Sequence, residues 1–76
     1  MNDLIGFIAQ QLVDNPDDVN VSRIEGNNTA VYELKVAKED VGKVIGRSGR
    51  TAQAMRTLLN AVCSKENKRG ILEIIE

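Results

Sequence analysis

The stretch VGKVIGRSGRTAQAMR, residues 41–56, contains three glycines, four cations and no acid. Gly46 and Gly49 enclose Arg47 and Ser48 near its centre. Because glycine has no Cβ, it permits backbone angles that other residues avoid and lets a ligand approach the main chain closely. Glycines, a cation and a hydroxyl at this spacing are typical of a site that binds an anion through the backbone.

A helix is expected to begin directly after these glycines, at Gly49 or Arg50. The first N–H groups of a helix have no partners within it, and the helix dipole makes this end positive. Exposed N–H groups flanked by Arg47 and Arg50 therefore predict a phosphate site. The Ser48 hydroxyl either adds a donor to that site or caps the helix, and the sequence leaves both roles open.

Two well-known phosphate-binding patterns fit this stretch poorly. The pattern G-x-x-x-x-G-K-[ST] would require glycine at Val44 and lysine at Arg50. The pattern G-x-G-x-x-G fails because Gly42, Gly46 and Gly49 are separated by four and three positions. The pattern that remains is G-x-x-G between two helices, which in KH domains clamps about four nucleotides of a single-stranded backbone.

The flanking sequence predicts the elements that must position this loop. Apolar residues at helical spacing predict a helix over residues 3–13, which ends before Pro16 because the residue preceding proline disfavours the helical conformation. VNVSRIEG (19–26) and TAVYELKVA (29–37) alternate on either side of a Gly/Asn turn. This alternation predicts an antiparallel hairpin.

Two helices and a strand complete the expected chain. KEDVGKVI (38–45) predicts a short helix that Gly46 ends, and the helix after the glycines extends to about Ser64. A charged loop, KENKRG, is followed by ILEII (71–75), which predicts a third strand. With a right-handed crossover between parallel strands, the order α-β-β-α-α-β predicts an α+β fold. Its three-stranded mixed sheet has the helices packed on one face, within one domain of residues 1–76.

The charge of the chain is unevenly distributed. Residues 1–40 hold eight acids and three bases (−5), residues 41–76 hold three acids and seven bases (+4), and the formal net charge is −1. A local basic face can therefore meet a polyanion on an acidic protein. The absence of His, with Cys63 as the single cysteine, excludes an internal disulfide and the usual zinc sites. We expect a cytoplasmic protein, not an enzyme, with no metal, cofactor or membrane span.

Other residues have plainer structural interpretations. Phe7 and Tyr32 are expected in the core, and Gly42 at a close contact between helices. Cys63 is expected to be a small core or edge residue, because no His exists to activate it. The cations of the loop 65–69 belong either to a solvated loop or to the binding site, and both interpretations stay open.

GKVIGRSGRTAQAMRTLL resembles the core signature of a KH domain, in which G-x-x-G follows an Ile and precedes a helix rich in Ala and apolar residues. Over its whole length the chain is similar to the small stand-alone bacterial KH proteins of the KhpA family. LVDNPDDVNV and KRGILEIIE also resemble that family in sequence and position. The resemblance implies a type II KH domain with its G-x-x-G loop at 46–49 and a variable loop at 65–69.

The resemblance also implies a binding groove between the G-x-x-G loop and the third strand, where bases rest on an apolar floor. Val44 and Ile45 are expected to shape that floor, and Lys43 and Arg56 are further candidates for the backbone clamp and its flanks. The complete set of expected RNA-binding residues is Ile45, Gly46, Arg47, Ser48, Gly49, Arg50, Lys43, Val44 and Arg56.

Members of the family look like RNA-binding proteins that dimerise, with themselves or with a larger KH protein of the KhpB type. The implied function is a post-transcriptional regulator or RNA chaperone that clamps single-stranded RNA and acts in the control of cell elongation and division. The alternative is a protein–protein dimerisation module whose RNA contact is secondary.

Overall fold

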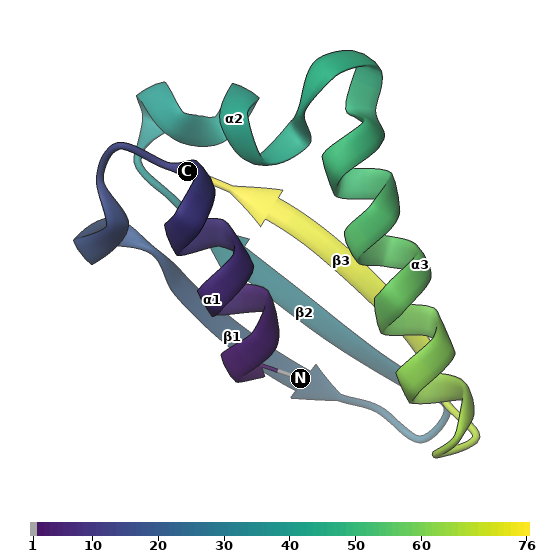
Figure 1. Cartoon of the computed structure of the whole chain (residues 1–76). Coiled ribbons are helices and arrows are strands. Elements are labelled where there is room, and N and C mark those ends of the chain that lie inside the picture. Colours follow the sequence, from purple (N-terminus) through teal and green to yellow (C-terminus); the bar gives the residue numbers. More distant parts are fainter. Residues whose placement is uncertain (1) are drawn as a thin grey trace.

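The computed structural model describes residues 2–76 (Figure 1). Its helices and strands follow the predicted order α-β-β-α-α-β, with short 3-10 turns between some of them. The bounds are α1 (Asn2–Leu12), η1 (Pro16–Asp18), β1 (Asn20–Glu25), β2 (Thr29–Lys35), η2 (Lys38–Asp40), α2 (Val41–Ile45), η3 (Arg47–Gly49), α3 (Arg50–Ser64) and β3 (Arg69–Ile75).

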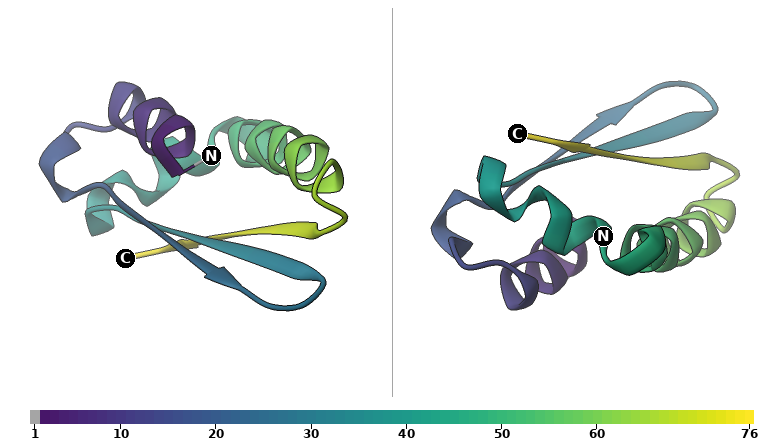
Figure 2. Two further views of the ribbon diagram at one scale, coloured as in Figure 1. Left: turned by 90° about the horizontal axis from the view of Figure 1, so that it is seen from below. Right: turned by 90° about the horizontal axis from the view of Figure 1, so that it is seen from above.

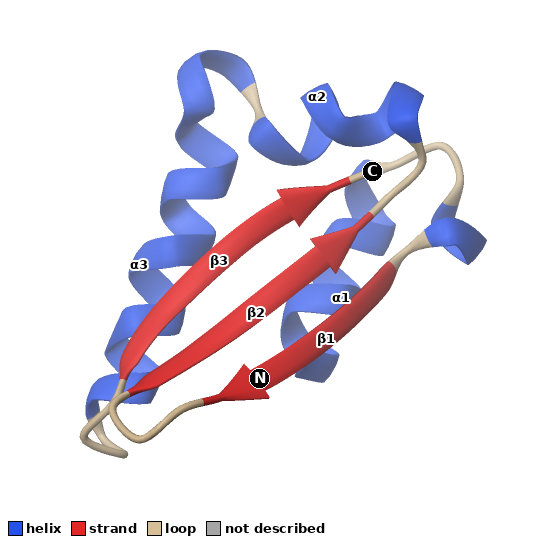
Figure 3. Ribbon diagram, turned by 180° about the vertical axis from the view of Figure 1, so that it is seen from behind, coloured by secondary structure: helices blue, strands red, loops and turns tan. Residues whose placement is uncertain are grey.

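The molecule has two layers, with the sheet on one side and the helices on the other (Figure 2). The strand order is β1-β2-β3, with β1 antiparallel and β3 parallel to β2. This confirms the predicted three-stranded mixed sheet with helices on one face. Within residues 2–76 no helix lies over the other face of the sheet (Figure 3), which we call the bare face.

The core lies between the sheet and the helices. Alternate residues of β2 are buried toward the helices, and Tyr32, which was expected in the core, is 0% exposed. Cys63 is also buried, as expected. The other buried apolar residues are Ile5 and Ala9 of α1, Ala30 and Leu34 of β2, Val36, Val44 of α2, Ala52, Met55 and Leu59 of α3, and Leu72 of β3.

Gly70 permits α3 to lie closely on β3. A Cβ at Gly70 would lie 3.1 Å from both the Sγ of Cys63 and the carbonyl oxygen of Leu59. Such contacts are tighter than protein packing tolerates without movement. The edge strand and the helix that follows the G-x-x-G loop are therefore held against each other at a glycine.

Three expectations about individual positions are wrong. Phe7 is 60% exposed, because α1 buries Ile5 and Ala9 and turns Phe7 outward. A Cβ at Gly42 would meet nothing within 4 Å, so this glycine is not at a close helix contact. The third strand begins at Arg69 rather than residue 71, because its pairing with β2 starts there.

None of the helices formed by residues 2–76 combines the length and the hydrophobicity required to cross a membrane.

Candidate nucleic-acid interface

The G-x-x-G loop joins α2 to α3 through three residues with positive φ. Gly46 has a φ of 79° and donates its N–H to the carbonyl of Gly42 at 3.0 Å, which ends α2. Ser48 and Gly49 have φ values of 56° and 74°. The Gly49 N–H donates to the carbonyl of Gly46 at 3.1 Å. The loop is therefore a closed turn that reverses direction before α3.

The two glycines of the loop are required for different reasons. A Cβ at Gly46 would collide with Thr51, lying 2.6 Å from its Cβ and 2.9 Å from its backbone nitrogen. A Cβ at Gly49 would meet nothing within 4 Å. Gly46 thus serves the close packing of the loop on α3. Gly49 serves the left-handed turn and leaves open space in front of the backbone.

The N-terminus of α3 is not capped by a side chain. Gly49 occupies the N-cap position, and no side-chain hydrogen bond is made there. Ser48 is therefore not the cap, and the role of its hydroxyl as a donor toward a ligand stays a prediction. The 15-residue α3 directs its first N–H groups and its positive dipole end toward this loop.

The cations around the loop make no ion pair with any other side chain among residues 2–76. The ion pairs in that part of the chain involve Arg23, Lys43 and Lys68. Arg47 and Arg50, which flank the loop, and Arg56, one and a half turns further along α3, are exposed. Because their charges are not neutralised internally, they are available to an anion.

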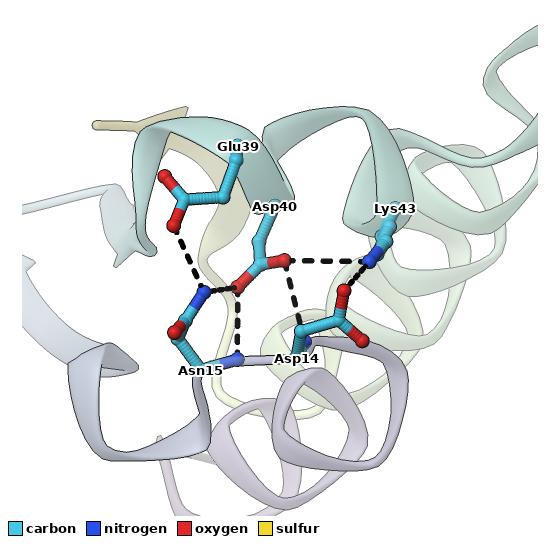
Figure 4. Close-up of polar contacts among 5 residues, drawn as sticks. All are labelled: Asp14, Asn15, Glu39, Asp40 and Lys43. Atoms are coloured by element: carbon cyan, nitrogen blue, oxygen red, sulfur yellow. Dashed lines mark hydrogen bonds and ion pairs between the residues drawn. The ribbon is translucent and has the colours of Figure 1, made fainter.

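The opposite situation holds at the other end of α2, in a set of residues that we call the Asp40 cluster (Asp14, Asn15, Glu39, Asp40 and Lys43; Figure 4). The Asp40 side chain is 0% exposed. It accepts hydrogen bonds from the backbone N–H groups of Asp14 at 3.3 Å and Asn15 at 3.0 Å, and from Asn15 Nδ2 at 2.9 Å. Asn15 Nδ2 also donates to Glu39 at 3.1 Å. These bonds fix the end of α1 to the beginning of α2.

Burial alone would disfavour the charged form of the Asp40 carboxyl, and it is the largest influence on this group. The hydrogen bond from the Asn15 side chain and those from the two backbone N–H groups outweigh it, with the nearby Lys43 adding to them. The pKa of Asp40 therefore lies below its ordinary value.

Lys43 belongs to this cluster rather than to the loop. Its Nζ donates to the Asp14 carboxylate and lies 3.7 Å from Asp40 Oδ1. The bond to Asp14 is the main reason that the pKa of Lys43 is raised. Among the expected RNA-binding cations Lys43 is thus the one already neutralised by the chain, and an RNA contact there remains a prediction.

The two residues expected to shape the apolar floor of the groove differ in exposure. Val44 is 0% exposed and belongs to the core, whereas Ile45 is 38% exposed. Adjacent residues of a helix point about 100° apart, so one faces the sheet and the other faces outward. Val44 therefore lies beneath that surface, and its part in shaping the floor stays a prediction.

A cavity of about 230 Å³ lies between α3 and the free edge of β3. Asn60 bridges its two walls, because its Oδ1 accepts the Gly70 N–H at 3.1 Å and its Nδ2 donates to the Arg56 carbonyl at 3.1 Å. The lining residues are Arg56, Asn60, Arg69, Gly70, Ile71 and Leu72. Arg69, the first residue of β3, and Arg56 of α3 both line this groove.

The edge of β3 that borders this groove offers main-chain groups. In a parallel pair, alternate residues direct both N–H and C=O toward the partner strand. The Ile75 carbonyl faces β2, because it accepts the Val36 N–H at 3.1 Å. The Gly70 N–H faces α3 instead. By this alternation, Leu72 and Ile74 direct their N–H and C=O groups to the free edge, on the side of the groove.

Sequence reasoning missed Asn60, Gly70 and the Asp40 cluster. A signal for Gly70 existed, since an isolated glycine in a strand pattern indicates a close approach of another backbone. Asn60 and Asp40 gave no such signal. Their partners lie 10 and 25 or more positions away in the chain.

Comparison with known proteins agrees with this geometry. A family model described as "KhpA/KhpB, KH domain" matches residues 2–74. The chain belongs to the KhpA/KhpB KH-domain family. The KH domain and the family expected from the G-x-x-G signature are therefore confirmed.

Three relatives show how completely the match covers this KH domain. A protein named RNA-binding protein KhpA from Caldanaerobacter subterraneus subsp. tengcongensis is 57% identical over 75 residues, covering 99% of this chain and 100% of the relative. Proteins of the same name from Chlamydia trachomatis and Aquifex aeolicus are 47% and 49% identical over 76 residues, covering 97% and 96% of their own length. No solved structure matches at a significant level.

The names of these relatives describe RNA-binding proteins and not enzymes, which agrees with the expectation that this KH domain has no catalytic activity. Within residues 2–76 no three His, Cys, Asp or Glu side chains gather to hold a metal ion.

Proposed function

We propose that this protein binds single-stranded RNA at the G-x-x-G loop. Arg47 and the N–H groups at the beginning of α3 hold the phosphates, with the Ser48 hydroxyl as a further donor. Ile45 offers an apolar surface to a base, and the free edge of β3 offers main-chain groups to base edges. Arg50 and Arg56 extend the basic surface along the groove.

One observation supports this proposal above the others. The open space in front of Gly49 lies at an uncapped helix N-terminus, beside arginines that have no partner among residues 2–76. A structural turn between two helices requires a glycine at its C-cap, but it requires neither the open space nor the unneutralised cations. The names of the relatives, which call them RNA-binding proteins, agree with the same function.

The partners and the cellular role belong to this proposal as well. The protein acts in the cytoplasm as a post-transcriptional regulator or RNA chaperone, as a homodimer or together with a larger KH protein of the KhpB type, in the control of cell elongation and division. A single KH domain clamps about four nucleotides, so a second copy would add affinity through avidity.

The test replaces Arg47 and Ser48 together with Asp. Two carboxylates at a phosphate site should abolish binding of a fluorescent single-stranded RNA of about eight nucleotides, twice the length that one clamp holds. A matched control, Lys38→Asp with Gln10→Asp, makes the same change in charge at exposed positions and should keep the affinity. Equal affinity of both variants would contradict the clamp, provided that circular dichroism shows both to be folded.

The alternative, a dimerisation module with secondary RNA contact, is favoured by the exposed apolar residues on the bare face, among them Ile24 at 54%. Salt distinguishes the two functions. RNA affinity should fall with a log–log slope of about −0.7 for each phosphate held. An apolar protein interface should respond weakly to the same change in salt.

A further inference from the structure

The bare face of the sheet carries an apolar row that crosses all three strands. The register places Ile24 of β1 opposite Val31 of β2, and Val31 opposite Ile71 of β3. Their neighbours along each strand, Arg23, Tyr32 and Gly70, face the helices. Successive strand residues point to opposite faces, so Ile24, Val31 and Ile71 point together into solvent. We call these three residues the apolar row.

Polar residues of opposite character flank the apolar row. Glu33 lies two residues after Val31 in β2, and Glu73 lies two residues after Ile71 in β3. The register places these two carboxylates opposite each other. Thr29 and Arg69 lie two residues before Val31 and Ile71, and the register places them opposite each other as well. None of these four side chains makes an ion pair or a hydrogen bond with another residue of the chain within 2–76. The face therefore has acceptors on one side of the apolar row and donors on the other.

This pattern is complementary to itself. A two-fold axis along the apolar row would turn a second sheet face to face with the first and would reverse its strand direction. Each residue of the row then meets its own copy. Glu73, two positions after Ile71, then meets Arg69 of the other copy, which lies two positions before it. In the same way Glu33 meets the hydroxyl of Thr29. Each contact occurs twice, as an interface with two-fold symmetry requires.

We propose that the bare face binds a second copy of this chain in this orientation. The proposal rests on the homodimer included in the proposed function and assigns its surface. A two-fold axis parallel to the strands is disfavoured, because it would place Glu33 directly against Glu33 of the second copy. The loop 46–49 joins α2 to α3 within the helical layer, on the opposite side of the sheet from this surface (Figure 2), so the dimer leaves the loop of each copy open.

The size of the face sets the strength expected of this dimer. Three strands at a spacing of about 4.8 Å, with strands of six or seven residues at a rise of about 3.3 Å, span roughly 14 by 23 Å. Such an area is about 320 Å² on each copy, which is below the roughly 1,000 Å² in total that a specific interface buries and corresponds to a weak, transient contact. We therefore expect a dimer that forms at high micromolar concentration and dissociates on dilution.

The test is sedimentation equilibrium of the full chain over a range of concentrations. Val31→Asp places an unpaired carboxylate in the centre of the interface and should raise the dimer dissociation constant at least about 30-fold. The matched control is Phe7→Asp, which introduces the same charge at an exposed apolar residue of α1 and should leave the constant unchanged. A wild-type chain that stays monomeric, or a Val31→Asp variant that dimerises as wild type does, would overturn the proposal.

A charge exchange tests the orientation and does not depend on the folding of the Val31 variant. Glu73→Arg places two cations opposite each other across the axis, and Arg69→Glu places two carboxylates there, so each should weaken the dimer. The double variant restores opposite charges and should recover most of the wild-type constant. Simply additive losses in the double variant would contradict the proposed axis.

The same samples separate this proposal from the function on which it rests. Val31→Asp should bind a single-stranded RNA of about four nucleotides, the length that one clamp holds, as tightly as wild type does. Wild-type chain that dimerises without binding RNA would contradict the RNA function alone. Wild-type chain that binds RNA as a monomer at every concentration would contradict the bare-face dimer alone.

Discussion

The Asp40 cluster and the G-x-x-G loop lie at the two ends of the five-residue helix α2. Within residues 2–76, polar side chains are paired in the cluster and are unpaired in the loop. In the cluster, the buried Asp40 carboxylate accepts three hydrogen bonds and Lys43 pairs with Asp14. In the loop, Arg47 and Ser48 have exposed side chains with no partner among residues 2–76, and no side chain caps α3.

The presence or absence of a partner within the chain is a criterion for separating charges that stabilise the fold from charges that are free to bind a ligand. A polar group that the chain satisfies contributes to the fold, since leaving a buried partner unsatisfied is costly. A cation that the chain leaves without a partner contributes little to stability and remains free for a ligand. Lys43 and Arg47 are only four positions apart in the sequence, yet within residues 2–76 Lys43 has carboxylate partners and Arg47 has none.

The largest change in stability is expected from substituting a glycine of the G-x-x-G loop. Gly46→Ala would combine a positive φ with a collision against Thr51, and we expect it to lower the free energy of unfolding by about 3 kcal/mol. Gly49→Ala has the positive φ without the collision and should cost about 1 kcal/mol. Urea unfolding of both variants measures the difference. Equal losses would mean that contact with Thr51 does not fix the loop.

A smaller effect is expected from removing one cation from the G-x-x-G loop or one from the Asp40 cluster. Arg47→Ala should weaken binding of single-stranded RNA about ten-fold, the loss of about 1.4 kcal/mol expected for one charge-assisted phosphate contact, and should leave the melting temperature unchanged. Lys43→Ala should lower the melting temperature and change RNA affinity less than two-fold. Fluorescence anisotropy measures the RNA affinity of both variants, and thermal melts on the same samples measure their stability. If Lys43→Ala lost RNA affinity and Arg47→Ala lost stability instead, the distinction between the cluster and the loop would be contradicted.

The smallest effect is a pH dependence confined to the Asp40 cluster. Because the pKa of Asp40 is lowered in the folded state, its ionised form stabilises the fold above the unfolded pKa of about 4. This contribution is lost as the pH falls through the folded pKa. Asp40→Asn should therefore be less stable than wild type at pH 7, and the gap should narrow below about pH 4. Urea unfolding at both pH values measures it.

The exposed Asp17→Asn is the control for this pH dependence, since Asp17 makes no side-chain hydrogen bond or ion pair within residues 2–76. RNA binding by Asp40→Asn should change less than it does for Arg47→Ala, because the cluster positions α2 without touching the loop. A gap in stability that is the same at pH 7 and at low pH would show that the Asp40 charge is not what the cluster uses.

The element order, the position of the loop and the local excess of cations could all be predicted from the sequence. These follow from short-range properties, namely the periodicity of apolar residues, the conformational freedom of glycine and the charge of neighbouring residues. Tyr32 could be assigned to the core from alternation alone. The family could be inferred because its signature and its flanks fall in one continuous stretch.

Which polar groups find partners and which surfaces stay bare depends on contacts between distant parts of the chain, so the sequence could not predict them. Asp14 and Lys43 are 29 positions apart, and Asn15 and Asp40 are 25 apart, so no local pattern could pair them. Phe7 shares the apolar character of the core, but the orientation of α1 on the sheet turned it outward. The apolar row likewise exists only through the register of three strands, because each strand contributes one of its residues.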